Sequence, residues 1–152
     1  MAGGRAGDAE RAEACARLSE SGIGCGVLMA PILPFLTDTP EQLEAGVRAA
    51  AAAGARSVTP IVLHLRPGAR EWYLRWLAGY RPDLIPAYEG LYGERAYAPR
   101  SYQRRITDLV ADLVADLTRA HGVGIRADHR PASAPAGHVD RAAPHGEQLT
   151  ML

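Results

Sequence analysis

The sequence has few of the residues that mark secreted, membrane-spanning or zinc-binding proteins. It holds only two cysteines, Cys15 and Cys25, and their spacing matches neither a C-x-x-C metal or redox motif nor a dense disulfide framework. No apolar signal-peptide core opens the chain, and no run reaches the roughly 18 apolar residues of a membrane span. We therefore expect a cytoplasmic protein without membrane contact. We expect both cysteines to be inert, with Cys15 in a helix and Cys25 packed as a small apolar side chain.

The sequence also contains no lysine, and its formal net charge is zero. The 17 basic and 17 acidic residues cancel, and every basic residue is arginine, so the overall charge selects no nucleic-acid or membrane partner. A G-x-S-x-G elbow, a P-loop and a His/carboxylate metal motif are also missing, which argues against a small complete hydrolase. The histidines of the tail are too irregularly spaced for a zinc site; they are His129, His138 and His145.

What the sequence does contain predicts an α/β fold in one domain of 152 residues. A helix over Ala9–Ser21 is followed by the apolar run Ile23–Leu36, which is typical of a buried parallel strand. Thr39-Pro40-Glu41-Gln42 then supplies a hydroxyl cap, a proline at the first helical position and a glutamine at the third. That helix extends to about Gly54, and a second apolar run follows over Ser57–Leu65. The two runs and the helix predict a right-handed βαβ unit with parallel strands.

The second half of the chain is predicted to be helical. Helices are expected over Ala69–Tyr80, Pro82–Tyr92 and Ser101–His121, separated by glycine and proline. The last of them has an apolar stripe at helical spacing, formed by Ile106, Leu109, Val110, Leu113 and Leu117. From Gly122 onward large apolar residues are scarce, so we expect a disordered tail.

Specific strings carry a resemblance to a known family. The run Ala30–Val58, APILPFLTDTPEQLEAGVRAAAAAGARSV, resembles a late strand and the following helix of radical SAM barrels. The strings HLRPG and RPDLIPAYEGLYG, within Pro60–Tyr92, and the following YAPRSYQRRI resemble a bacterial subgroup related to spore photoproduct lyase, which is described as DNA-repair-photolyase-like. The subgroup resemblance covers about two thirds of the chain.

The resemblance implies a fragment of a (β/α)6 barrel. Cys25–Pro34 would be strand five and Ser57–Leu65 strand six, so that residues 9–65 form the last part of the barrel. Residues 1–8 would be a disordered N-terminus, 66–122 a helical extension and 123–152 a disordered tail. The family binds S-adenosylmethionine (SAM) and a [4Fe-4S] cluster through C-x-x-x-C-x-x-C, a motif that this sequence lacks. We therefore expect the chain alone to be inactive, unless an upstream polypeptide supplies the cluster-binding half.

Barrel active sites gather at the carboxyl ends of the strands. By the resemblance, the backbone of Leu63, His64 and Leu65 would lie near the adenine of SAM, and His64 and Arg66 would face the substrate. Structural alternatives stay open for each candidate, because a histidine at a strand end is as often only hydrogen-bonded in place. Asp38 could face the barrel mouth, but we favour a turn or helix-capping role for it.

A non-enzymatic alternative rests on charge and aromatic residues. Eight arginines lie between His64 and Arg105 against four acidic residues, and they could bind nucleic acid or another anionic partner; a solvated face is the simpler interpretation. Trp72, Tyr73 and Trp76 could stack on bases, but their spacing is more typical of a buried helix face. The sequence therefore predicts either a radical SAM fragment or a small binding module.

Overall fold

The computed structural model describes the backbone of residues 3–128 and the side chains of residues 9–128. Its elements, in chain order, are α1 (Gly3–Glu20), β1 (Gly26–Ile32), α2 (Pro40–Ala52), β2 (Ser57–Val62), α3 (Ala69–Tyr80), the 3-10 helix η1 (Pro82–Leu84), α4 (Ile85–Tyr92), α5 (Arg100–His121) and β3 (Arg126–Ala127). The predicted α/β class is confirmed. Among the helices of this part of the chain, none is both long and apolar enough to cross a bilayer.

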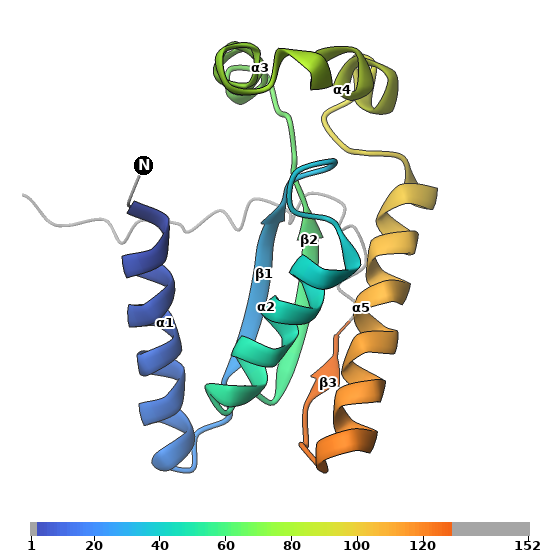
Figure 1. Cartoon of the computed structure of the whole chain (residues 1–152). Helices are drawn as coiled ribbons and strands as arrows, with labels where there is room; N and C mark the ends of the chain where they lie inside the picture. The colour runs from blue at the N-terminus through green and yellow to red at the C-terminus, as the bar shows by residue number, and fades with distance from the viewer. Residues whose placement is uncertain (1–2, 129–152) are drawn as a thin grey trace, which may run out of the picture.

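The three strands form one parallel sheet in the order β1, β2, β3. Because both crossovers run in the same direction across the sheet, the right-handed rule places α2 and α5 on the same face. The two helices do pack against each other, and α5 also contacts β2 and β3 (Figure 1). Parallel pairing of the two predicted apolar strands is thereby confirmed.

Helix α2 begins as its sequence predicts. The Thr39 hydroxyl accepts a hydrogen bond from the backbone N–H of Gln42, and the Gln42 side chain accepts one from the backbone N–H of Thr39. This reciprocal capping box, with Pro40 at the first helical turn, fixes where the helix starts. Its predicted stripe of Leu43, Val47 and Ala50 is buried.

The two ends of the chain differ from expectation. Helix α1 begins at Gly3 rather than at Ala9. The tail was expected to be disordered from residue 123, and this is wrong for residues 123–128, because β3 pairs with β2 and Ile125 is only 4% exposed. The α5 helix ends at Gly122, whose φ of 64° suits glycine, and this turn returns the chain to the sheet. The rest of the predicted tail, with its three histidines, lies outside the described residues.

The face of the sheet opposite α2 is open at β1. Met29 contacts Gly46 of α2, so the alternation of a strand points its neighbour Leu28 the other way, and Leu28 is 57% exposed. Its register partner Thr59 on β2 is only 8% exposed. Among the described residues, no strand pairs with the outer edge of β1. Helices α2 and α5 therefore cover one face of the sheet, and in the described part of the chain the outer edge of β1 has no strand beside it.

Candidate functional site

The candidate residues gather where β1 and β2 end. The segments after these strands, residues 33–39 and 63–68, lie at the same edge of the sheet because the strands are parallel. Helices α3 and α4 lie beyond this edge, at the top of the view (Figure 1). Loops that follow parallel strands are the usual place for a binding site in α/β proteins.

His64 lies just beyond β2 and contacts Tyr97. Its ring meets the Tyr97 ring edge-on, with 4.5 Å between the centroids, and the two residues form an isolated antiparallel bridge. Partial burial lowers the pKa of His64 below its usual 6.5, and the positive charge of Arg66 lowers it further. Among residues 9–128, the peptide N–H and C=O of His64 have no hydrogen-bond partner. His64 is also an exposed residue, so its position is a candidate for ligand contact.

The neighbours of His64 are held by the protein itself. The Leu63 N–H donates to the Ile32 carbonyl at 3.0 Å, and its carbonyl accepts from the Tyr92 hydroxyl at 2.7 Å. Leu65 is buried, and its N–H donates to the Ala96 carbonyl at 2.7 Å. Of the three predicted adenine-side residues, His64 alone has neither peptide group hydrogen-bonded within the described part. Arg66 is exposed, and its guanidinium has no hydrogen-bond or ion-pair partner among the residues described.

Asp38 does not cap α2, contrary to our preferred interpretation, because Thr39 performs that role. The Asp38 carboxylate instead accepts a hydrogen bond from the Tyr102 hydroxyl and lies 3.6 Å from the Arg105 guanidinium. Burial raises the pKa of Tyr102, and the hydrogen bond to Asp38 raises it further. Asp38 therefore joins the segment after β1 to α5 at the candidate site.

Three tyrosine hydroxyls connect the helical extension to the segments after the strands. Tyr88 donates to the Pro34 carbonyl at 2.6 Å, Tyr92 donates to Leu63, and Tyr102 donates to Asp38. Sequence reasoning missed these contacts. Buried tyrosines need a partner for the hydroxyl, but the sequence does not identify which carbonyl or carboxylate provides it.

Phe35 introduces backbone strain at the site. Its φ of 61° lies in the left-handed region, which is costly for a bulky side chain. The Phe35 ring lies 5.8 Å from the Tyr88 ring and 6.5 Å from the Tyr102 ring, measured between centroids. Strained residues of this kind persist where their surroundings fix them, and they concentrate at functional sites.

The predicted aromatic and arginine clusters are only partly realised. Tyr73 is buried, whereas Trp72 is 64% exposed, so the three aromatic residues do not share one buried face. Four of the eight arginines are engaged within the protein: Arg70 with the carbonyls of Gly93 and Arg95, Arg81 with Asp83, Arg95 with the Tyr92 carbonyl, and Arg105 with Asp38. In the part that the structure covers, Arg66, Arg75, Arg100 and Arg104 have no such partner.

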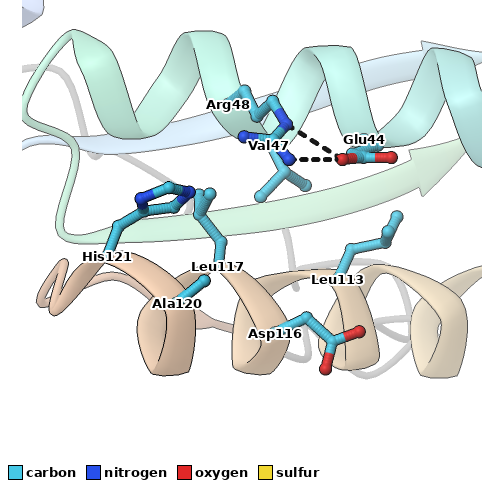
Figure 2. A pocket seen from close by; sticks show the side chains of 8 residues that line it. All are labelled: Glu44, Val47, Arg48, Leu113, Asp116, Leu117, Ala120 and His121. Atoms are coloured by element: carbon cyan, nitrogen blue, oxygen red, sulfur yellow. Dashed lines mark hydrogen bonds and ion pairs between the residues drawn. The ribbon is translucent and has the colours of Figure 1, made fainter.

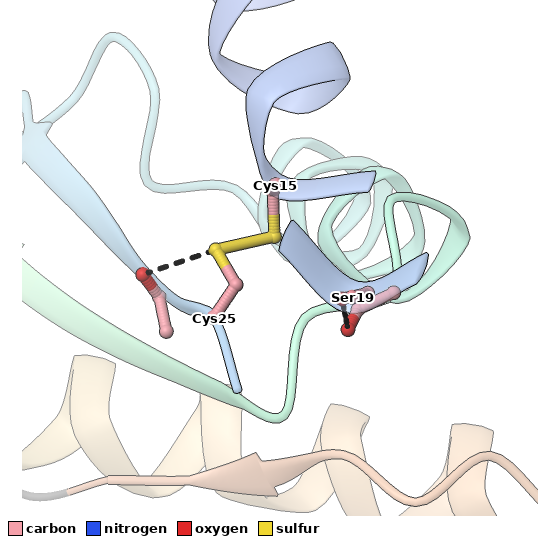
Figure 3. Close-up of a disulfide and its surroundings, with 5 residues drawn as sticks. Cys15, Ser19 and Cys25 are labelled. Carbon is pink, nitrogen blue, oxygen red and sulfur yellow. Dashed lines mark hydrogen bonds between the residues drawn. A yellow bond between two sulfur atoms is a disulfide. The ribbon is translucent and has the colours of Figure 1, made fainter. Parts of the chain in front are cut away.

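Cys15 lies in a helix, as expected, but the two cysteines are bonded to each other, a pairing that the sequence did not predict. Cys15 in the second half of α1 and Cys25 before β1 form a disulfide (Figure 3). The α1 helix folds back beside β1 and brings together two residues whose spacing resembles no common motif. Within residues 9–128, no three His, Cys, Asp or Glu side chains are gathered for a metal ion.

A pocket lies away from these residues. It has a volume of about 190 Å³ and lies between α2 and α5 (Figure 2). Val47, Leu113 and Leu117 line it, and the ion pair between Glu44 and Arg48 borders it. His121 also lines the pocket but ends α5, so this pocket lies toward the opposite end of the sheet from His64.

Comparison with known proteins finds relatives that are longer than this chain. An uncharacterized protein of Mycobacterium tuberculosis strain H37Rv and another of Mycobacterium bovis are each 42% identical to it over 112 residues, which are 74% of this chain and 31% of the relative. The chain thus spans about a third of the length of the curated relatives it matches. No family model matches the sequence, and no solved structure matches it significantly.

Proposed function

We propose that this chain forms the last part of a radical SAM barrel and contributes the adenine side of the SAM site. The observation that carries the proposal is a parallel sheet with both crossover helices on one face and with no strand beside β1 among the described residues. In a barrel the helices lie outside and each strand is paired on two sides, so the last strands taken alone would leave one edge for the strand that precedes them. In this proposal β1 is strand five, β2 is strand six and β3 lies beyond the six barrel strands.

The greater length of the mycobacterial relatives agrees with this proposal. A cluster-binding segment would belong to the part of such a protein that this chain does not match, whether on the same polypeptide or on a separate upstream one. The cysteines of this chain do not fit a [4Fe-4S] cluster, because they number two and are paired with each other. The chain's own contribution would be binding and orientation.

His64 is the residue through which this contribution would act. Its peptide N–H and C=O, which have no partner within residues 9–128, match the donor and acceptor pattern on the edge of an adenine ring, while Leu63 and Leu65 fix the backbone on either side. When bound with a reduced cluster, SAM would supply a 5'-deoxyadenosyl radical for hydrogen-atom abstraction, as the family resemblance implies. Arg66 and the imidazole of His64 would then face the substrate.

The first experiment uses the full-length M. tuberculosis relative. The protein is loaded anaerobically with iron and sulfide, and reductive cleavage of SAM to 5'-deoxyadenosine is measured. The third of the relative that aligns with this chain is then replaced by the aligned segment of this chain. The proposal expects a cluster and SAM cleavage in both proteins. A relative that binds no cluster would refute the family assignment, and an active relative with an inactive but folded chimaera would refute the assignment of this chain.

A pair of substitutions tests the role of the His64 backbone in the chimaera. His64→Pro removes the peptide N–H, whereas His64→Ala removes the imidazole and keeps the peptide. Loss of one hydrogen bond to the ligand should weaken SAM binding about tenfold in the proline variant, with little change in the alanine variant. Equal affinities in two folded variants would contradict a backbone role.

The binding module remains a second candidate because four arginines lack partners within the described part. Arg66 and Arg100 follow, in sequence, the contacting rings of His64 and Tyr97, which could stack on a base. Binding of a single-stranded oligonucleotide by this chain would be measured at several salt concentrations. For this candidate, Arg66→Ala should reduce the slope of log affinity against log salt by about 1. The Arg81→Ala control, at a residue paired with Asp83, should leave the slope unchanged.

A further inference from the structure

Helix α1 has little buried surface of its own. Among the side chains described in this helix, residues 9–20, only Cys15 is buried, at 3% exposure. Leu18, a large apolar residue, is 41% exposed. A helix with so little apolar burial gains little stability from packing, so its specific links to the rest of the molecule determine where it lies.

Two such links lie near the carboxyl end of α1. The disulfide joins Cys15 to Cys25 with 5.7 Å between the Cα atoms, an ordinary separation for a bonded pair. One helical turn later, the Ser19 hydroxyl donates a hydrogen bond of 2.8 Å to the carbonyl of Gly54. Figure 3 shows the disulfide and Ser19 close together at the base of the helix. The covalent link is the stronger of the two.

Helix α1 also forms one wall of a groove along the open edge of the sheet. The groove has a volume of about 350 Å³. Arg11 and Ala12 of α1 line one side, small residues of α2 such as Gly46 line another, and residues 27–31 of β1 form the base. Since consecutive residues of β1 line it, the groove follows the backbone edge that no strand covers among the described residues.

We propose that the Cys15–Cys25 disulfide is a redox latch that holds α1 as the outer wall of this groove, so that reduction releases α1 and uncovers the free edge of β1. An exposed strand edge is a template for pairing with another strand. The latch would therefore control access to the pairing edge of the sheet. This inference does not depend on the radical SAM proposal.

The chemistry is an exchange with a dithiol reductant. A thiolate of the dithiol attacks Cys25 Sγ, because Cys25 is the more exposed of the pair. The bond between the two protein sulfurs breaks, and Cys15 leaves as a thiolate that takes up a proton. The second thiol of the reagent attacks the mixed disulfide and releases the Cys25 thiol. Two electrons pass to the protein, and the reagent becomes a cyclic disulfide.

Hydrogen exchange of the whole chain, with and without dithiothreitol, tests the latch. The disulfide spans a sequence separation of 10 residues, and opening a loop of that size should favour the detached helix by about 100-fold by chain entropy. Amide exchange in α1 should rise by up to the same factor, and exchange at the β1 edge should rise with it. Exchange in the buried part of α5 serves as the internal control and should not change.

Matched variants distinguish the effect of losing the disulfide from a general loss of stability. The double variant Cys15→Ser/Cys25→Ser should exchange like the reduced protein whether or not dithiothreitol is present. The variant Ser19→Ala loses the hydrogen bond to Gly54 but keeps the disulfide, so it should still respond to the reductant. Equal α1 exchange in the oxidised and reduced protein would overturn the proposal, as would peptide mapping that finds no Cys15–Cys25 bond after oxidation.

Discussion

The hydrogen-bonded pair of Tyr73 and Tyr88 makes a directional prediction about stability. Tyr88 is 1% exposed, and its hydroxyl donates to the Pro34 carbonyl at 2.6 Å. Because the Tyr88 hydroxyl uses its only proton in that hydrogen bond, its oxygen accepts a hydrogen bond from the Tyr73 hydroxyl at 2.8 Å. The order of donation is therefore Tyr73 to Tyr88 to Pro34, and the two tyrosines should not be equivalent in their contribution to the free energy of unfolding.

The expected costs follow from which groups lose a partner. Tyr88→Phe leaves both the Pro34 carbonyl and the Tyr73 hydroxyl unpaired in the interior, which should cost about 3 kcal/mol in all. Tyr73→Phe removes a donor but leaves the Tyr88 bond to Pro34 intact, which should cost about 1 kcal/mol. The double variant leaves only the carbonyl unpaired, so it should be about 1.5 kcal/mol more stable than the sum of the single costs implies.

Urea unfolding, followed by the fluorescence of the two tryptophans, measures these differences. Tyr80→Phe is the matched control, because Tyr80 is 63% exposed and its change should stay within about 0.5 kcal/mol. The reasoning is refuted if Tyr73→Phe costs as much as Tyr88→Phe, or if the two effects simply add.

Two further predictions concern protonation. Burial is the main cause of the raised pKa values of Tyr88, Tyr92 and Tyr102. Their folded-state pKa values therefore exceed the unfolded value of about 10, so stability is full below that pH and falls above it by about 1.4 kcal/mol per pH unit for each tyrosine. Urea midpoints at rising pH measure this slope, which Tyr92→Phe should reduce by one tyrosine's share; an unchanged slope would contradict the assignment. The His64 imidazole should titrate below 6.5 in NMR spectra, and Arg66→Ala should raise its midpoint toward that value, whereas no change would show that the Arg66 charge does not act there.

Helices whose ends are marked by glycine, proline or a capping residue were predictable from the sequence. Helix α3 covers Ala69–Tyr80 as expected, because Gly68 precedes it and Pro82 follows it. The α2 capping box was readable from four consecutive residues. In α5 the predicted apolar stripe is largely correct: Ile106, Val110 and Leu117 are buried. Val114 is buried as well, although it was not among the stripe residues.

Features that depend on distant parts of the chain were not predictable. Strand β3 has only two residues, too few for a periodic pattern, and it forms because Gly122 turns the chain back beside β2. The disulfide depends on how α1 folds against β1. From the sequence alone, Asp38 could have capped α2. In the structure Thr39 is the cap, and the Asp38 carboxylate accepts a hydrogen bond from Tyr102 of α5. In each case the missing information is the identity of the partner.

Two buried tyrosines of α4 connect the helical extension to the segments that follow β1 and β2. Tyr88 and Tyr92 are one helical turn apart on α4, and their rings stack at 5.9 Å with 10° between their planes. This spacing points both hydroxyls toward the sheet, where they reach the backbone after β1 and after β2 at Pro34 and Leu63. Both tyrosines belong to the string AYEGLY, within the segment that carries the subgroup resemblance. The two hydroxyls link α4 to the segments that follow β1 and β2. Substitution of either tyrosine should therefore alter the backbone of the candidate site, although α4 itself lies outside the loops that form it.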